Sequence, residues 1–498
     1  MKKIVRNLVS IIAFTALPAI SQFASISAQE FVKSDFMVSD LSDYFYKSPQ
    51  LSVNEMGEMV VVWETTGTGS IWFKTISSLG TQLGEEKLVP SANSTMEPRV
   101  AYADSGNFMV MYGGYYGSWS VYGQVYDRNG NEIGDTLELQ RNTSEMMNMT
   151  FASLFADQNN HFGAFFSGMD SMMVEKISGT GEFVGNTIIL KPELPYTHEM
   201  RGAMTRSGQF IMVWHAGFSG DIRGQRYTPE GIPIGESFLV GQIDEKSNLQ
   251  DFTLDSDTSG NFAVVWATWN GSKGEIYSQL FSAEGVSVGS NTRISEEQSN
   301  FEVANGEMSI DMDVDGKIVI AWPDTRGTDT SFIYLQQLDK LGVPVGGNYR
   351  ATTINNDIQP GTSLPKQIDP SVKILRDTIY LAWCNYNLDV SNRQDIFANI
   401  QKWMPDYTGL DQQINTAMQS TVYPNPSSGI FSLIMDREYS GRLELDVFNT
   451  TGALVKREIR SWSGPETTID ISGVPVGMYY INIKGDSFTS TTPLIIIK

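Results

Sequence analysis

Gly130-Asn131-Glu132-Ile133-Gly134 is one of six copies of the phrase Gly-x-x-aliphatic-Gly that decide the fold of this 498-residue chain. Counted between the first glycines of successive copies, the steps are 50, 51, 50, 54 and 57 residues. A nearly constant period of this length indicates one supersecondary unit repeated along the chain. The six copies occupy residues 80–84, 130–134, 181–185, 231–235, 285–289 and 342–346.

Each repeat also contains a short apolar run that ends in an aromatic residue. Such runs, bounded by turn residues, are typical of buried strands. A weaker strand precedes each run, a third strand follows it, and the glycine phrase leads into a fourth. Four antiparallel strands per repeat predict an all-β fold, a seven-bladed β-propeller. The seven runs are residues 59–63, 108–112, 162–166, 210–214, 262–266, 318–322 and 379–383.

The seventh unit lacks the phrase and the fourth strand, because the segment that ends at Trp403 passes directly into Met404-Pro405. The missing strand is available at the other end of the chain, where residues 34–40 resemble a fourth strand. We therefore expect residues 29–403 to form the propeller and an N-terminal strand to close its ring. Without that strand the last unit would leave an open edge, which favours aggregation.

The first 28 residues resemble an export signal. Lys2, Lys3 and Arg6 precede an apolar stretch, and small residues follow it up to Ala28. No later stretch is long and apolar enough for a transmembrane helix, so we predict an exported protein without a transmembrane segment. The alternative is a membrane anchor. Removing the three cations from the 35 Lys+Arg leaves 32 against 57 Asp+Glu, a balance of −25 that argues against nucleic acid as partner.

Residues 404–420 are polar and without pattern, which suits a linker. From residue 421 onwards, short alternating strands and regular turn signals predict a small C-terminal β-sandwich. Its opening reads Val422-Tyr-Pro-Asn-Pro426, and further signals follow in order to the end of the chain. The residues that carry the pattern are Pro424, Asn425, Pro426, Gly429, Gly452, Gly477, Tyr479 and Lys498.

Residues 421–498 closely resemble the C-terminal sorting domain of the type IX (Por) secretion system of Bacteroidota. The resemblance implies that the secretion machinery is a partner and that the chain crosses the outer membrane after the signal peptide is removed. In that family the sorting domain is commonly cut off, and the cargo is released or attached to the cell surface. The alternative is a carbohydrate-binding or adhesion sandwich.

Motifs for catalysis are absent from the sequence, and no catalytic residue or cofactor is predicted. There is no Gly-x-Ser-x-Gly elbow, no His-Glu-x-x-His and no phosphate-binding loop. The segment Asp311-Met-Asp313-Val-Asp315-Gly316 has the alternating acids of a calcium loop, but Trp322 stands where a bidentate Glu is required. Calcium is the one cofactor left open; an ordinary hairpin turn is the alternative.

The loops after the aromatic-ended strands leave the same face of the predicted disc. Aromatic side chains beside acids and amides suit stacking on sugar rings or clamping a protein partner. The leading hypothesis is a secreted or surface-displayed binding protein for a glycan or protein ligand. The alternatives are a polysaccharide hydrolase or lyase, or a structural component of the cell surface; the aromatic residues then pack between blades. The candidate ligand contacts are Tyr115, Tyr116, Trp119, Phe218, Trp269, Asp324, Arg326 and Tyr386.

Overall fold

The structure of the protein is a computed structural model in which the chain divides into two compact units, Met1–Asp406 and Tyr407–Lys498. Each unit is described by itself. The expected signal peptide and most of the expected linker lie outside the described residues. The structure describes residues 30–40, 45–66, 68–90, 95–115, 119–139, 148–167, 171–192, 197–216, 220–244, 247–296, 299–300, 307–326, 330–353, 366–387, 393–403, 420–423, 425, 427–449, 454–484 and 489–497.

Seven antiparallel sheets of four strands make up the described part of the first unit. Sheet 1 contains β2 (Phe45–Val53), β3 (Met59–Thr66), β4 (Ser70–Ile76) and β5 (Lys87–Leu88); sheet 2 contains β6 (Thr95–Tyr102), β7 (Phe108–Tyr115), β8 (Trp119–Tyr126) and β9 (Glu132–Glu138). Sheet 3 contains β10 (Asn148–Ala156), β11 (His161–Ser167), β12 (Met172–Ser178) and β13 (Ile188–Leu190); sheet 4 contains β14 (Thr197–Met204), β15 (Phe210–Ala216), β16 (Asp221–Tyr227) and β17 (Pro233–Gln242).

The remaining three sheets continue this order along the chain. Sheet 5 contains β18 (Asn248–Ser256), β19 (Phe262–Trp269), β20 (Gly274–Phe281) and β21 (Ser287–Arg293). Sheet 6 contains β22 (Ser309–Met312), β23 (Ile318–Asp324), β24 (Phe332–Leu338) and β25 (Pro344–Arg350). Sheet 7 contains β26 (Lys366–Leu375), β27 (Thr378–Asn387), β28 (Arg393–Lys402) and, from the other end of the chain, β1 (Phe31–Met37).

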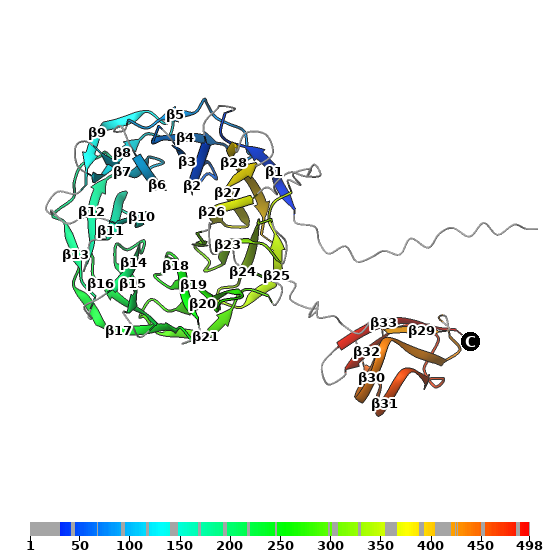
Figure 1. The fold of residues 1–498 in the computed structure, drawn as a ribbon. Coiled ribbons are helices and arrows are strands. Elements are labelled where there is room, and N and C mark those ends of the chain that lie inside the picture. The colour runs from blue at the N-terminus through cyan, green and yellow to red at the C-terminus, as the bar shows by residue number, and fades with distance from the viewer. Residues whose placement is uncertain are drawn as a thin grey trace, which may run out of the picture. The chain divides into compact units, whose positions relative to one another are not determined.

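The seven sheets stand side by side in a closed ring (Figure 1). The first strands of the sheets, β2, β6, β10, β14, β18, β22 and β26, are innermost; each contacts the next, and β26 contacts β2. This radial arrangement of four-stranded antiparallel sheets is the architecture of a β-propeller. The described residues contain no helix, and therefore no helix that could cross a membrane.

The strand β1 supplies the fourth strand of sheet 7. It pairs antiparallel with β28, with Phe31 opposite Gln401 and Met37 opposite Phe397. The bond from the Lys402 amide to the Glu30 carbonyl extends this pairing by one residue. The closing strand therefore spans Phe31–Met37, a few residues earlier than the sequence pattern around residues 34–40 indicates.

The aromatic residues that end the apolar runs of the second strands form the core between the sheets; the strands themselves continue past them. Their tryptophans are all buried: Trp63, Trp214, Trp266, Trp322 and Trp383. These strands have buried sheet neighbours on both faces, which explains why they are apolar throughout rather than alternating.

The glycine phrase turns the third strand of a sheet into the fourth. At Gly130 and Gly134 the backbone φ is +72° and +69°, a conformation that glycine adopts without steric cost. A buried glutamine of the third strand fixes the turn, since Gln225 donates through Nε2 to the carbonyl oxygen of Ile234 at 3.0 Å. Gln124, Gln279 and Gln336 make the equivalent bond to Ile133, Val288 and Val345. The recurring glutamine is thus a structural residue of the repeat.

The second unit contains β29 (Ser420–Tyr423), β30 (Ile430–Asn449), β31 (Leu454–Asp470), β32 (Gly477–Lys484) and β33 (Thr489–Ile496). Strand pairing joins all five into one sheet, in which the long β30 pairs with β29, β31 and β32. Ser427 returns to β33 through a parallel bridge to Ile496, so the two ends of the sheet meet around a common apolar core. The two separate sheets of a sandwich stay a prediction.

Candidate ligand-binding site

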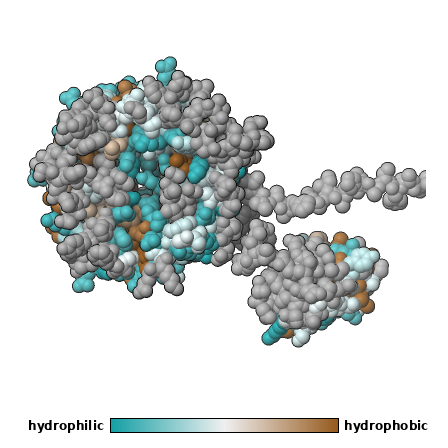
Figure 2. Space-filling view, in the orientation of Figure 1, coloured by the Kyte–Doolittle hydropathy of each residue, from teal (hydrophilic) through white to brown (hydrophobic). Residues whose placement is uncertain are grey.

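The innermost strands surround a cavity of ≈ 140 Å³ at the centre of the ring. Figure 2 shows hydrophilic residues gathered in this hollow. Every one of the seven sheets contributes to its lining, through β2, β6, β10, β14, β18, β22 and β26. A site at this place therefore exists only when the whole ring has formed.

One position of the repeat places a polar side chain on the cavity in every sheet. In each sheet, one inner-strand residue pairs with the residue that precedes the aromatic at the end of the apolar run. Arg99 pairs in this way with Met111, and Ser371 pairs with Ala382. We call these seven residues the polar collar: Gln50, Arg99, Ser153, Arg201, Thr253, Ser309 and Ser371. Amide, hydroxyl and guanidinium groups give the collar both donors and acceptors.

Side chains of the inner strands also bond the backbone of the neighbouring sheet. Ser371 accepts a hydrogen bond from the Leu51 amide at 3.0 Å, which links sheet 7 to sheet 1. Ser309 accepts one from the Val372 amide at 3.0 Å, and Ser153 donates to the Gly202 carbonyl at 2.8 Å. Because these bonds cross from sheet to sheet, they fix the collar without contributions from loops.

Asp251, which lines the cavity, and Asp369, next to the lining residue Pro370, have raised pKa values. Burial raises the pKa of Asp251 to about 6, although Arg201 lies 3.1 Å away and opposes the shift. Burial, with Glu307 adding to it, raises the pKa of Asp369 to about 7. Asp369 precedes Pro370, which lines the cavity. These two carboxyl groups therefore exchange protons close to neutral pH.

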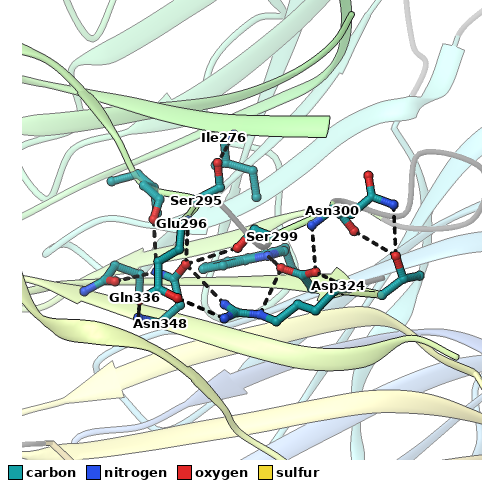
Figure 3. Close-up of polar contacts among 12 residues, drawn as sticks. Ile276, Ser295, Glu296, Ser299, Asn300, Asp324, Gln336 and Asn348 are labelled. Atoms are coloured by element: carbon teal, nitrogen blue, oxygen red, sulfur yellow. Dashed lines mark hydrogen bonds and ion pairs between the residues drawn. The ribbon is translucent and has the colours of Figure 1, made fainter. Parts of the chain in front are cut away.

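A second group of polar residues lies on sheets 5 and 6 and is drawn in Figure 3. Asp324 accepts hydrogen bonds from Trp322 Nε1 at 3.0 Å and from the Asn300 and Arg326 amides at 2.9 Å. Arg326 binds Glu296 at 2.9 Å and stacks on Tyr334, with 3.9 Å from the guanidinium carbon to the ring centre. Together these contacts hold the chain before β22 against the end of β23.

This network also reaches the loop after Trp269. The amide of Gly274, which pairs with Trp269 across that loop, donates to Asn300 Oδ1 at 3.4 Å. Of the predicted ligand contacts, the structure brings Asp324 and Arg326 together, and their network reaches the backbone that pairs with Trp269. Trp269 and Arg326 are half-buried, and Tyr386 is half-buried on sheet 7.

Asp324 differs from the expectation of an exposed ligand contact. Its side chain is 0 % exposed, because its carboxylate turns back to bind the indole and two backbone amides. Tyr115 and Trp119 lie at the ends of β7 and β8 and pair with each other in the strand register. Tyr116 and Phe218 lie outside the described residues.

The acids of the segment Asp311–Gly316 bind separate partners. Asp311 contacts Lys373 at the cavity, whereas Asp313 accepts bonds from the Asp315 and Lys317 amides at 2.9 Å within the hairpin turn. In the part of the chain that the structure describes, no group of three or more His, Cys, Asp or Glu residues is arranged to hold a metal ion. We therefore do not propose calcium for this segment.

The cavity residues were not predicted from the sequence. A signal was present in three repeats, where polar residues alternate with apolar ones in the first strand: Gln50-Leu-Ser-Val53, Ser309-Ile-Asp-Met312 and Ser371-Val-Lys-Ile374. The pattern was not recognised because these strands are only weakly apolar. Which of their faces lines the cavity is shown only by the closed ring.

Several sorting residues hold the second unit together. Asn425 Oδ1 accepts a hydrogen bond from the Ile495 amide at 2.9 Å, and the Tyr479 hydroxyl donates to the Pro475 carbonyl at 2.8 Å. Gly429 has φ +110° and lies against Ser472. Gly477 opens β32. Pro424, Pro426, Gly452 and Lys498 lie outside the described residues.

The comparison with protein families identifies this second unit. Residues 421–498 match the family model described as the secretion system C-terminal sorting domain. The second unit is a sorting domain. The chain is therefore a client of the type IX secretion machinery and leaves the cytoplasm, to be secreted or attached to the surface. No curated protein matches the chain.

Several solved structures are similar to the ring. One is a protein of unknown function from Dyadobacter fermentans, with 10% identity and a TM-score of 0.45 over 76% of this chain and 100% of that chain. Another is polysaccharide lyase Uly1, with 10% identity and a TM-score of 0.45 over 76% and 98%. The β-propeller domain of the Trilobed protease from Pyrococcus furiosus has 8% identity and a TM-score of 0.43 over 73% and 99%.

Proposed function

We propose that this protein is an exported seven-bladed β-propeller that binds a glycan at the polar collar and the adjoining loop face. The observation that carries the proposal is the collar itself: all seven sheets place an amide, hydroxyl or guanidinium group on one cavity. Hydroxyl groups of a sugar match such a mixed set of donors and acceptors. The sorting domain supports a role at or outside the cell surface.

The size of the cavity favours a small polar group over a folded partner. At ≈ 140 Å³ it admits a sugar residue or a side chain, but no element of a protein. A longer glycan would extend from the collar onto the loop face. There we propose Tyr115, Tyr116, Trp119, Phe218, Trp269, Arg326 and Tyr386 as further contacts. A protein ligand of the loop face is the alternative.

The two carboxylates that meet at Lys373 do not suit glycoside hydrolysis. Asp255 and Asp311 contact the same Lys373 ammonium, and each also accepts a backbone amide of the next sheet. A glycosidase needs its two carboxyl groups on opposite sides of the scissile bond, about 5–9.5 Å apart and open to the substrate. We therefore place binding before hydrolysis.

A hydrolase or lyase remains the second candidate, because of Asp251 and Asp369. Carboxyl groups whose pKa values lie near neutral pH are suited to proton transfer, and cavities are where such groups are found in enzymes. Product release from acidic and neutral polysaccharides, lost in Asp251→Asn and Asp369→Asn variants, would move this candidate to first place.

A glycan array probed with the purified mature chain tests the proposal. For a hit, the collar variant Gln50→Ala and the variant Trp269→Ala, at the end of β19, are expected to lower affinity about tenfold each, the effect of losing about 1.4 kcal/mol. Asp135→Asn, at an exposed position of β9 beside the glycine phrase, is the control and should bind like the unmodified chain. Absence of any glycan hit, or full affinity in both variants, would refute glycan binding at this site.

A further inference from the structure

Charged side chains occupy a second position of the inner strands, but only in three consecutive sheets. This position lies two residues after the collar position on the inner strand. Across the pair of strands, Asp255 lies opposite Ala263, Asp311 opposite Val319 and Lys373 opposite Tyr380. The equivalent residues of sheets 1 to 4 are uncharged: Ser52, Ala101, Phe155 and Ala203.

The three charged residues join sheets 5, 6 and 7. Asp255 Oδ2 accepts a hydrogen bond from the Met312 amide at 3.2 Å, which links β18 to β22. Asp311 Oδ2 accepts one from the Ile374 amide at 2.7 Å, which links β22 to β26. Lys373 Nζ lies 2.5 Å from Asp311 Oδ1 and 3.9 Å from Asp255 Oδ2. One ammonium therefore serves two carboxylates.

Sheets 1 and 2 make the same kind of link with a neutral group. Ser52 Oγ accepts the Tyr102 amide at 2.9 Å, where Asp255 and Asp311 use carboxylates. A hydroxyl has no charge to lose or gain between pH 5 and pH 9, whereas a carboxylate beside a second carboxylate does. The ring thus contains a neutral link, through Ser52, that can be compared with the two carboxylate links, through Asp255 and Asp311.

The charges at the three-residue cluster do not balance when all three groups are ionised. Burial raises the pKa of Asp311 well above its ordinary value; Lys373 opposes this shift and the neighbouring Asp255 adds to it. Around the cluster, Arg201 and Glu307 face Asp251 from β14 and from the chain before β22. A proton on Asp311 removes the repulsion across the β18–β22 contact.

We propose that Asp255, Asp311 and Lys373 form a proton-dependent clasp that holds sheets 5, 6 and 7 together at the cavity. With one proton on Asp311 the clasp is closed. When that proton is lost at higher pH, the two carboxylates repel and the contact between β18 and β22 loosens. The clasp is independent of the proposed ligand, because it belongs to the ring itself.

Amide hydrogen exchange of the full chain between pH 5 and pH 9, corrected for the intrinsic rate, tests the clasp. Protection of the Met312 and Ile374 amides should fall relative to the Tyr102 amide, by about tenfold for each pH unit above the midpoint. The variants Asp311→Asn and Asp255→Asn should each remove this relative change. Having two variants guards against misfolding of one of them, because either substitution alone suffices for the test.

Two results would overturn the clasp. One is an equal change of protection at Met312, Ile374 and Tyr102, which would mean that the whole ring loosens together. The other is a wild-type pH dependence at Met312 in both asparagine variants. Lys373→Met gives a further check, since loss of the ammonium should move the midpoint to higher pH.

Discussion

Lys74, on the third strand of sheet 1, lies 2.8 Å from the carboxylate of Asp40, which follows the closing strand β1. The lysine side chain is 1 % exposed, whereas Asp40 is 56 % exposed. Gln82 also accepts from Lys74, and its own amide donates to the Met37 carbonyl at 3.0 Å. Sheet 1 therefore binds the closing strand that completes sheet 7.

Asp40→Ala should destabilise the ring, because it removes the partner of a buried ammonium. Loss of such a partner costs about 1–3 kcal/mol. Thermal unfolding of the mature chain should show a lower Tm for this variant. The double variant Asp40→Ala with Lys74→Met removes the buried charge as well and should recover part of the loss; an equal loss in both would contradict the ion-pair explanation.

The buried glutamine of the third strand should matter more than an exposed one. Gln225→Ala removes bonds to the Arg226, Ile234 and Gly235 carbonyls and leaves these acceptors inside the sheet. We expect a loss of about 1–3 kcal/mol in unfolding free energy, measured by denaturant titration. Gln242→Ala, on the exposed end of β17, is the control. A similar effect of both variants would mean that the repeated glutamine has no special role.

The sequence predicted the architecture because the repeat and the core are local patterns. Seven aromatic-ended runs became the second strands of seven sheets, and the unequal number of glycine phrases pointed to a strand from the N-terminus. The match of residues 421–498 to the sorting domain confirms the resemblance read from the C-terminal motifs.

The site was less predictable, for a physical reason. Whether a polar residue faces solvent, a cavity or a buried partner depends on the neighbouring sheet, which is about 50 residues away in the sequence. Asp324 was expected at the surface, yet its side chain is buried and accepts a hydrogen bond from the Trp322 indole. Arg99 and Lys373 were not predicted as site residues, yet closure of the ring brings both to one cavity.

The ring should be more stable at pH 5 than at pH 8. The folded-state pKa values of Asp251 and Asp369, about 6 and about 7, exceed the value of about 3.9 for an unfolded aspartate. The folded chain therefore holds more protons between these values, so the free energy of unfolding rises as pH falls through 7 to 5. The destabilising effect of Asp251 is complete near pH 7 and that of Asp369 near pH 8, about one pH unit above each pKa.

Thermal unfolding at pH 5, 6, 7 and 8 measures this dependence. Asp251→Asn and Asp369→Asn should flatten the curve, whereas Asp135→Asn, at an exposed position, should not. Carboxylates with lowered pKa values, such as Glu58 beside Arg128, lose their stabilising effect only at more acid pH and do not interfere. A Tm that rises from pH 5 to pH 8 would show the sign to be wrong.

Gly429→Ala should disrupt the sorting domain and with it export. The residue has φ +110°, which costs a side-chain-bearing residue about 1–3 kcal/mol, and an added Cβ would lie 2.5 Å from the Ser472 backbone. Gly464→Ala separates the two effects, because Gly464 has φ +108° but open space around its Cβ position. Gly473→Ala, with open space and no positive φ, is the neutral control.

The measurement is the share of the chain that reaches the medium or the cell surface rather than the periplasm. We expect near-complete retention for Gly429→Ala, partial retention for Gly464→Ala and normal export for Gly473→Ala. The unfolding transition of the sorting domain in the full chain should fall in the same order. Normal export of a Gly429→Ala chain whose sorting domain is measurably destabilised would mean that the machinery reads the sequence of this domain rather than its fold.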